Sequence, residues 1–192
     1  VFERVVEYFY LYKGVSIYYA QSIETLGEDL KEIKPTIMPT VPRLLEKVYD
    51  KIIAKGSSLR GLKKALFFWA VRLGLRHEYG GKNGILYELQ LVIANKIIFN
   101  KWREAVGGRI RYIFSGASAL QERIAKIFTA AKMPILEGYG LSETSPVISV
   151  NLAHTKNACY GTVGPVIEGV ELKLQHEEGM KEGEGEITIK GP

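Results

Sequence analysis

The spacing of apolar and polar positions predicts an alternation of helices and extended segments along the first third of the chain. Apolar residues recur at helical intervals over residues 2–12, whereas residues 15–19 are rich in β-branched and aromatic residues and predict a strand. Residues 25–33 predict a short helix. The segment from Pro35 to Pro42 is expected to be extended, because each proline restricts the residue before it. Pro42 is expected to begin the next helix.

Residues 55–108 predict an antiparallel pair of helices. The helical patterns cover residues 59–76 and 85–105, and a loop with three glycines separates them at 77–84. The first helix has an apolar stripe made of Leu59, Leu62, Leu66, Trp69 and Leu73. The second has one made of Leu86, Leu89, Ile93 and Ile97. Other apolar residues of the first helix are mixed with Lys and Arg, which favours burial against the second helix over a separate interfacial face.

Two strand-to-turn passages follow. Residues 112–114 and 133–136 predict buried strands, and a helix over 120–132 separates them. Ser118 and Gln121 have capping-box spacing, which would start that helix. In an open α/β sheet, ligands bind at turns that leave the carboxyl ends of strands. Further strands are expected at residues 147–150, 170–175 and 186–190, with a polar loop over 151–160 and a charged turn over 177–185.

The second of these turns, residues 137–144, carries residue types that suit a nucleotide. Gly138 and Gly140 leave the backbone bare around the flat ring of Tyr139. Ser142 adds a hydroxyl group and Glu143 a hard carboxylate ligand, which suit a phosphate and Mg²⁺. Spacing alone slightly favours an ordinary tight turn with exposed polar residues, because short turns that contain glycine are common.

Charge is distributed unevenly along the chain. The net charge is +5, but residues 43–111 hold 15 Lys or Arg residues and 5 Asp or Glu residues, a net charge of +10. Such a basic stretch could face nucleic acid, an anionic membrane or the phosphates of a large substrate, or it could be a solvated set of helices. No nucleic-acid-binding motif accompanies it, so we expect no nucleic-acid partner.

The composition bears on disulfides, metal sites and membrane spans. One cysteine, Cys159, excludes an internal disulfide framework and favours a reducing, cytoplasmic compartment. The three histidines lack metal-ligand spacing. No apolar run is long enough to span a bilayer, and no signal peptide is visible.

Four segments, taken in order, resemble the adenylate-forming enzymes, a superfamily that includes acyl-CoA synthetases, luciferases and peptide-synthetase adenylation domains. The segments are 115–120 (Ser-Gly-Ala-Ser-Ala-Leu), 139–144 (Tyr-Gly-Leu-Ser-Glu-Thr), 161–165 (Gly-Thr-Val-Gly-Pro) and 185–192 (Gly-Glu-Ile-Thr-Ile-Lys-Gly-Pro). The resemblance covers the whole chain. It is closest to long-chain fatty acyl-CoA synthetases, which carry a similar helical pair where the other groups are compact.

The resemblance implies an α/β fold: part of the large N-terminal domain of these enzymes, with a mixed sheet flanked by helices and an inserted helical pair. The whole chain, 1–192, would be a partial AMP-binding domain. Within it, 55–108 would be the helical insertion, 109–146 would hold the adenine and phosphate/Mg²⁺ turns, and 161–192 would be the last strands. The phosphate loop, the hinge and the catalytic lysine of the family are expected outside the chain, so residues 1–192 alone are expected to be inactive.

The resemblance also implies roles for individual residues. ATP (bound as AMP in the product) and Mg²⁺ would be the cofactors, CoA the co-substrate and a fatty acid the substrate. Ser142 and Glu143 would be catalytic, and Glu143 would hold the metal. The remaining cofactor-binding residues would be Gly116, Ala117, Ser118, Gly138, Tyr139, Gly140 and Leu141, together with Ser142. Ala117 stands where the family often has Gly, and Ser142 where it often has Thr; both keep the small size or the hydroxyl group.

The expected activity is that of an AMP-forming long-chain fatty acid–CoA ligase. The alternatives are another adenylate-forming enzyme, such as an aryl-CoA ligase or an amino-acid adenylation domain, and a non-catalytic lipid-binding or interaction module that reuses the fold. Weak peripheral contact with an anionic membrane is the further expectation from the +10 stretch.

Overall fold

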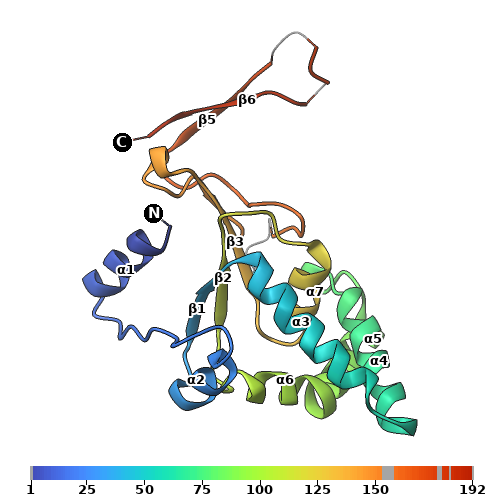
Figure 1. Ribbon diagram of the computed structural model, residues 1–192. Helices are drawn as coiled ribbons and strands as arrows, with labels where there is room; N and C mark the ends of the chain where they lie inside the picture. The colour runs from blue at the N-terminus through green and yellow to red at the C-terminus, as the bar shows by residue number, and fades with distance from the viewer. Residues whose placement is uncertain (1, 153–157, 177–178, 182, 192) are drawn as a thin grey trace.

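The computed structural model describes residues 2–152, 158–176, 179–181 and 183–191. Its centre is a four-stranded sheet in the order β1-β2-β3-β4 (Figure 1). The strands are β1 (Ile37–Thr40), β2 (Tyr112–Ser115), β3 (Ile135–Tyr139) and β4 (Ser149–Val150). β1, β2 and β3 are parallel and β4 is antiparallel, so the sheet is mixed, as the resemblance implied.

The two faces of the sheet differ because successive strand residues point to opposite sides. Ile113 and Ile135 are paired in register and buried, and they face the hydrophobic core. Their neighbours Phe114 and Leu136 line a cavity on the other side. Figure 1 shows the layers: α1 (Phe2–Tyr12) on one side of the sheet, and α3 (Pro42–Ser57), α4 (Gly61–Leu75) and α7 (Glu122–Ala130) on the other.

The connection from β1 to β2 holds most of the helices. After α3 and α4, a short 3₁₀ turn (Tyr79–Gly81) leads to α5 (Ile85–Ala94). α5 continues through a π-helical turn, η2 (Asn95–Phe99), into α6 (Asn100–Ala105). The expected helical pair is therefore present, but its second member is three consecutive helical segments instead of one regular helix.

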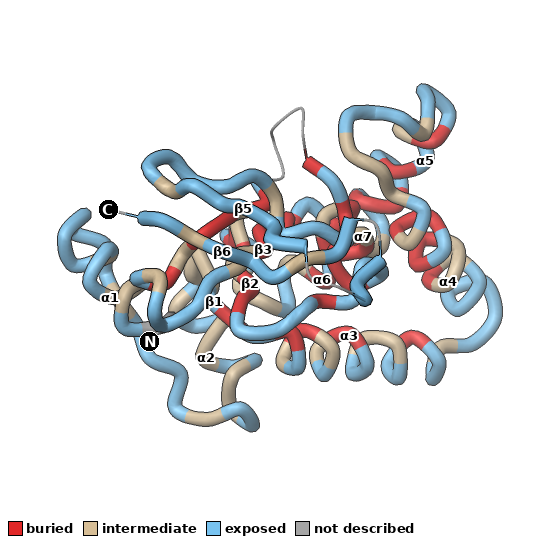
Figure 2. The backbone as a smooth tube through the Cα atoms, turned by 90° about the horizontal axis from the view of Figure 1, so that it is seen from above, coloured by how far each residue is buried: buried red, intermediate tan, exposed pale blue. Residues whose placement is uncertain are grey.

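The apolar stripe predicted for the second helix is wrong, and the stripe predicted for the first is right only in part, since Leu73 is buried and Leu59 and Trp69 pack against the core. In α4 the buried face is formed by Phe67, Ala70, Val71, Leu73 and Gly74, while Leu62 of the predicted stripe is 74% exposed. In α5 the buried side is Tyr87, Leu91 and Ala94, and the predicted stripe lies in solvent. Figure 2 shows α5 at the edge of the molecule, with much of its surface exposed. The buried faces are set by contacts with α7 and with each other, which single-helix periodicity does not contain.

Other boundaries were predicted with mixed success. The helix over residues 2–12, the extended segment after Pro35 and the helix that begins at Pro42 are confirmed, and the short second helix is α2 (Leu26–Ile33). The strand expected at residues 15–19 is wrong, because this segment has no strand assignment. The capping box is also wrong: α7 begins at Glu122 with Gln121 as its N-cap, and no side chain caps it.

The last two strands form a separate antiparallel hairpin, β5 (Glu171–Gln175) and β6 (Glu186–Lys190), with Leu174 opposite Ile187. Figure 1 shows this hairpin projecting from the rest of the molecule. Both strands were expected from sequence. Parts of the predicted polar loop (153–157) and charged turn (177, 178 and 182) lie outside the described residues.

No helix among the described residues combines the length and the apolar character that crossing a bilayer requires.

Candidate nucleotide site

The candidate site is a cavity of about 720 Å³ at the carboxyl ends of β2 and β3. Parallel strands bring their carboxyl ends to one edge of a sheet, so the turns that follow them become neighbours. Eight of the nine residues proposed for the nucleotide line this cavity, and Ser118 does not. The eight are Gly116, Ala117, Gly138, Tyr139, Gly140, Leu141, Ser142 and Glu143.

The first turn follows β2 directly. Ser115 is buried, and its Oγ has no hydrogen-bond partner among the described residues. Ser115 is paired in register with Glu137, and its side chain points to the same side of the sheet as that of Ile113, away from the cavity. Two residues later Ala117 has a φ of +68°, the left-handed conformation that glycine adopts most easily.

The second turn is built by close backbone packing. β3 extends through Tyr139, three residues beyond the strand end expected at Leu136, and a 3₁₀ turn, η3 (Ser142–Thr144), follows Gly140 and Leu141. A Cβ atom on Gly140 would lie 1.5 Å from the carbonyl oxygen of Pro146, so no other residue fits without moving the backbone. Thr144 Oγ1 accepts the N–H of Leu141 at 3.0 Å and lies 3.0 Å from the oxygen of Pro146. These contacts fix the turn that carries Ser142 and Glu143.

Ser142 and Glu143 are exposed at the cavity wall. Among the described residues Glu143 forms no ion pair, and no three His, Cys, Asp or Glu side chains group as a metal site. One free carboxylate fits Mg²⁺, which is commonly held by one or two carboxylates together with substrate phosphates and water. The residues present therefore fit a nucleotide-bound Mg²⁺ better than a metal held by the protein alone.

The other wall of the cavity is apolar, and sequence reasoning did not find it. Four residues of α1 (Val5, Val6, Phe9 and Tyr10) lie against Ile37, Phe114 and Leu136 from the sheet. The hydroxyl group of Tyr10 is buried and, among the described residues, has no hydrogen-bond partner. The periodicity of residues 2–12 predicted an amphipathic helix, but nothing in the sequence shows that it crosses the face of a sheet whose strands lie up to 130 residues away.

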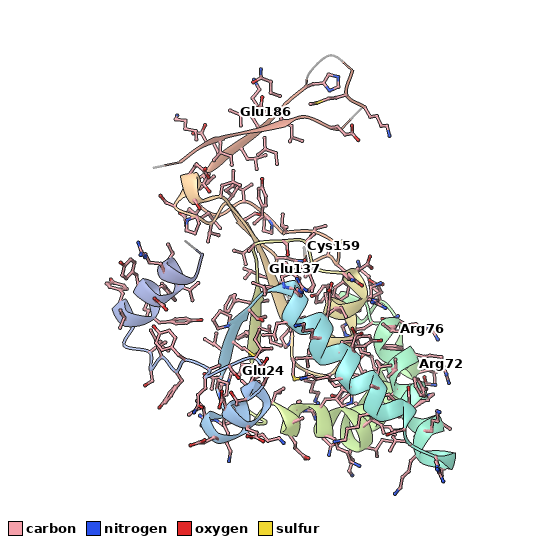
Figure 3. The ribbon with its side chains drawn as sticks, viewed as in Figure 1. Glu24, Arg72, Arg76, Glu137, Cys159 and Glu186 are labelled. Carbon is pink, nitrogen blue, oxygen red and sulfur yellow. The ribbon has the colours of Figure 1, made fainter. Side chains whose placement is uncertain are left out.

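Glu137 belongs to β3 but faces away from the cavity, opposite to its neighbours Leu136 and Gly138. Figure 3 shows it within the sheet. Its side chain is 8% exposed, and burial raises its pKa to about 7. The backbone N–H of Leu120 donates to it, which partly opposes that shift. Through this bond Glu137 supports the turn that runs from Ser115 to Leu120.

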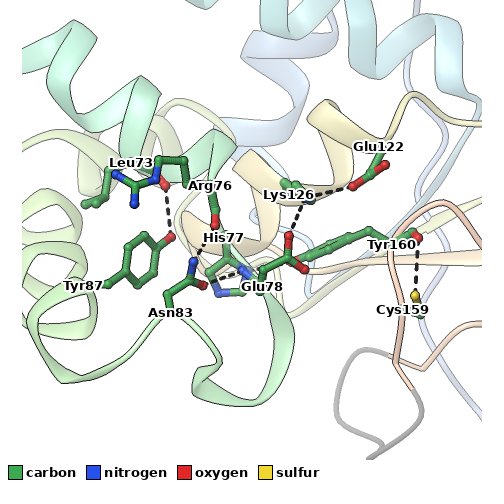
Figure 4. A network of polar contacts seen from close by, with 10 residues as sticks. All are labelled: Leu73, Arg76, His77, Glu78, Asn83, Tyr87, Glu122, Lys126, Cys159 and Tyr160. Carbon is green, nitrogen blue, oxygen red and sulfur yellow. Dashed lines mark hydrogen bonds and ion pairs between the residues drawn. The ribbon is translucent and has the colours of Figure 1, made fainter.

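A polar network next to Glu137 ties the helical pair to the rest of the domain (Figure 4). Lys126 of α7 forms ion pairs with Glu78 and Glu122. His77 Nδ1 and the hydroxyl of Tyr160 lie 2.6 Å apart, and Tyr79 stacks on Tyr160 with ring centres at 4.1 Å. Burial lowers the pKa of His77, so the imidazole is neutral in this network at pH 7.

The segment 161–165 is a structural part of the sheet edge and does not line the cavity. Asn151 Nδ2 donates to the carbonyl oxygens of Cys159 at 2.6 Å and Thr162 at 3.0 Å. The N–H of Val150 donates to the oxygen of Pro165 at 3.2 Å, and Gly164 lies too close to Val150 for any side chain. These bonds hold the segment 161–165 against β4, on the side away from β3.

Comparison with known proteins agrees with this site. The family model described as "AMP-binding enzyme" matches residues 1–192, so the chain belongs to that family of adenylate-forming enzymes. Long chain acyl-CoA synthetase 3 of Arabidopsis thaliana is 34% identical over the whole chain, which spans 29% of that protein. Long-chain-fatty-acid–CoA ligase 1 of Homo sapiens is 33% identical, and the chain spans 27% of it. Residues 1–192 thus correspond to less than a third of these relatives.

The fold is also found in solved structures. The N-terminal domain of FACL13 from Mycobacterium tuberculosis superposes with a TM-score of 0.56 at 17% identity, covering 95% of this chain and 36% of that one. This likeness supports the fold implied by the resemblance: a mixed sheet with flanking helices, as in the N-terminal domains of adenylate-forming enzymes.

Proposed function

We propose that the full-length protein is an ATP-dependent long-chain fatty acid–CoA ligase. One observation carries the proposal: a single cavity joins the exposed amides, hydroxyl group and carboxylate of two turns to an apolar wall from α1 and the sheet. Such a cavity suits an adenylate whose acyl group is apolar. The two relatives described above are long-chain acyl-CoA synthetases by name, which favours a fatty substrate over an aryl or amino acid.

The reaction would run in two steps. A fatty carboxylate oxygen attacks the α-phosphorus of ATP, and pyrophosphate leaves with the electron pair of the broken P–O bond. The thiolate of CoA then attacks the acyl carbonyl of the adenylate, and AMP leaves. Because a carboxylate oxygen is a poor leaving group, adenylation supplies a better one. The protein contributes mainly by holding both substrates in line and by neutralising charge.

Each turn would serve one part of the nucleotide. The ring of Tyr139 would stack on adenine, with Gly116 and Ala117 along its edge, while Ser118 lies outside the cavity lining. Gly138, Gly140 and Leu141 would form the wall behind it, where small side chains and bare backbone allow close approach. The Ser142 hydroxyl would donate to an α-phosphate oxygen. Glu143 would hold Mg²⁺, which when bound supplies positive charge to the phosphates.

Pyrophosphate exchange in the full-length protein tests the proposal. We expect long-chain fatty acids to stimulate exchange between labelled pyrophosphate and ATP, and aryl or amino acids to do so weakly or not at all. Preferential stimulation by an aryl or amino acid would assign the protein to another adenylate-forming class. No stimulation by any carboxylate would favour a non-catalytic role of the fold.

The role of Glu143 makes a separate prediction. Glu143→Gln keeps the size of the side chain and removes its charge, so adenylation should slow by about 100-fold or more, since losing metal-ion charge stabilisation costs several kcal/mol. The unfolding temperature should stay unchanged because this side chain is exposed. Glu168→Gln, at an exposed position outside the cavity, is the matched control and should adenylate like the wild type. A Glu143→Gln enzyme with normal exchange would reduce Glu143 to a turn residue.

A further inference from the structure

Four polar side chains lie next to one another across the carboxyl ends of the sheet, on its core side. Thr40, Ser115 and Glu137 are paired in register across β1, β2 and β3. Asn151 follows β4, and its N–H donates to the carbonyl oxygen of Glu137 at 2.8 Å, so it continues the same row. Side chains at such paired positions point to one side of a sheet. We call these four residues the polar row.

The polar row is buried by this chain alone. Its members are between 2% and 8% exposed, so the rest of the full-length protein has little of them left to cover. Polar side chains buried to this degree are normally hydrogen-bonded. Among the described residues, however, Ser115 Oγ and Asn151 Oδ1 have no hydrogen-bond partner. These two residues are the neighbours of Glu137 on either side.

The orientation of the Asn151 amide group is fixed by its other contacts. Its Nδ2 donates to the carbonyl oxygens of Cys159 and Thr162, which can only accept a hydrogen bond. Oδ1 is therefore the atom that requires a partner, and this partner must be a donor. On the other side of Glu137, the hydroxyl group of Ser115 can donate or accept. A group between the two must give a proton to Asn151 and can take a hydrogen bond from Ser115.

A protonated carboxyl group meets both requirements, and a carboxylate does not. Protonated Glu137 has an O–H for Asn151 Oδ1, and it can accept from Ser115 as it already accepts from the backbone N–H of Leu120. An ionised Glu137 can only accept, so Asn151 Oδ1 would face a second acceptor. Burial points the same way, because it raises the pKa of Glu137 to about 7.

The groups around Glu137 do not neutralise a charge on it. No charged side chain among the described residues is a cause of its pKa shift, and none forms an ion pair with it. The pKa of Tyr79 is raised by burial and, less strongly, by the charge of Glu137, so this neighbour disfavours a second negative charge. Lys126 is already paired with two carboxylates. The titratable groups of the surrounding elements are those of the polar network: His77, Glu78, Tyr79, Glu122, Lys126, Cys159 and Tyr160.

We propose that Glu137 is a positioning residue that holds both turns of the nucleotide site through its protonated carboxyl group. As an acceptor it holds the first turn at Ser115 and Leu120, and as a donor it holds Asn151 beside β3. Gly138, the next residue of β3, lines the nucleotide cavity, so the carboxyl group anchors the start of the second turn as well. The inference rests on the proposed function only in taking this cavity as the nucleotide site.

Ionisation of Glu137 breaks this link between the turns. The site then binds nucleotide well only in the fraction of molecules in which Glu137 is protonated, and the apparent dissociation constant rises as that fraction falls. With a pKa of about 7, the protonated fraction falls about 10-fold between pH 6 and pH 8. Nucleotide affinity should therefore weaken by about 10-fold over the same range.

Isothermal titration calorimetry of the full-length protein with ATP tests the proposal at pH 6 and at pH 8. The wild type should show the loss of affinity described above. Glu137→Gln carries an amide group that donates to Asn151 and accepts from Leu120 at both pH values, so it should keep at pH 8 the affinity that the wild type has at pH 6. Comparison of the two proteins removes the titration of the nucleotide itself. Glu168→Gln, at an exposed position outside the cavity, is the matched control and should follow the wild type.

Two further measurements separate positioning from a general structural effect. Infrared difference spectroscopy without nucleotide should show the C=O stretch of a buried protonated carboxyl group in the wild type at pH 6, and Glu137→Gln should lack this band. Glu137→Leu offers neither a donor nor an acceptor, so it should weaken ATP binding at least ~10-fold at pH 6, where Glu137→Gln binds normally.

Three results would overturn the positioning role. One is the absence of the protonated band from the wild type at pH 6, and another is an equal change of ATP affinity with pH in the wild type and Glu137→Gln. The third is a loss of affinity in Glu137→Gln at pH 6. Any of these together with normal pyrophosphate exchange by the wild type would leave the proposed function in place. A wild type that binds no ATP at either pH would overturn the proposed function and the positioning role together.

Discussion

At the scale of single residues, the first turn of the site is strained at Ala117, and glycine at this position would adopt the same conformation without strain. Ala117 adopts a φ of +68°, where the Cβ atom of an L-residue crowds the following carbonyl group. Ala119, two residues on, is equally exposed and is not among the residues with positive φ. Both alanines of this turn are exposed, and they differ in backbone conformation.

Ala117→Gly should stabilise the protein by roughly 0.5–1 kcal/mol, because relief of the left-handed strain exceeds the entropy that glycine adds to the unfolded chain. Ala119→Gly should instead destabilise it by a similar amount. Chemical denaturation of both variants beside the wild type gives the two signs. The same sign for both would mean that the turn does not hold Ala117 in this conformation.

Glu137 should make stability depend on pH. Its pKa is raised from 4.5 to about 7 in the folded protein, so the folded state holds a proton that the unfolded state has lost between these values. Stability should therefore fall as pH rises from about 4.5 to 7, by up to about 3 kcal/mol from this group, and then level off.

Glu137→Gln keeps an acceptor for the N–H of Leu120 and removes the titration. In the variant, the free energy of unfolding should lose the part of its pH dependence that Glu137 supplies. Denaturation of both proteins at pH 5 and at pH 8 measures this loss, because the drop in the free energy of unfolding between the two pH values should be smaller in the variant. If the free energy of unfolding changed equally in wild type and variant between pH 5 and pH 8, the carboxyl group would not be buried as described.

At the scale of elements, Gly138 and Gly140 in the turn at residues 137–144 differ in how closely other atoms pack against them. Gly140 has the oxygen of Pro146 where its Cβ would be, whereas the nearest atom to a Cβ on Gly138 is the oxygen of Ser149 at 3.8 Å. Gly140→Ala should therefore destabilise the protein by about 3 kcal/mol or more, since the backbone must move. Gly138→Ala, the matched control, should change stability by less than about 1 kcal/mol. Thermal unfolding followed by circular dichroism measures both, and equal effects would contradict the described packing of the turn.

The π-helical turn is held by a buried amide. Asn95 donates to Leu91 and Ala130, and Arg103 donates through Nη1 to Asn95 Oδ1 at 2.7 Å. Asn95→Ala should cost about 2–3 kcal/mol, because a buried carbonyl and part of a guanidinium group lose their partners. Asn100→Ala removes one local bond to the N–H of Lys101 and should cost less than about 1 kcal/mol. Urea denaturation compares the two, and similar losses would show that the network adds no stability.

What could be predicted at this scale depended on whether the signal was local. The helix at Pro42 and the strand over Glu186–Lys190 follow from a proline and from alternation within a few residues, and both are confirmed. The segment 15–19 has the composition of a strand, but it belongs to neither sheet of the described residues. The face of α5 could not be assigned either, because periodicity finds an apolar stripe without saying what covers it.

At the scale of the whole molecule, the two turns of the site were predictable and the cavity was not. Residues 115–118 and 137–144 could be singled out because small residues follow strands whose carboxyl ends share an edge. The apolar wall needs α1 to lie across the sheet, and that contact depends on a chain path between α1 and β2 of about a hundred residues. The roles of individual site residues remain predictions that the exchange assay and the Glu143→Gln variant address.

The long connection between β1 and β2 has a consequence for how the protein is made. The two strands are neighbours in the sheet, yet residues 41–111 separate them. At roughly 5–20 residues per second of synthesis, β1 emerges several seconds before its partner exists. Closing so long a loop is slow, so the helices between the strands have time to fold first. Pro39 lies inside β1, which is the last strand on its side of the sheet formed by the described residues, and it offers no amide for pairing. While β1 waits for β2, the missing amide is therefore expected to disfavour pairing of β1 with another nascent chain.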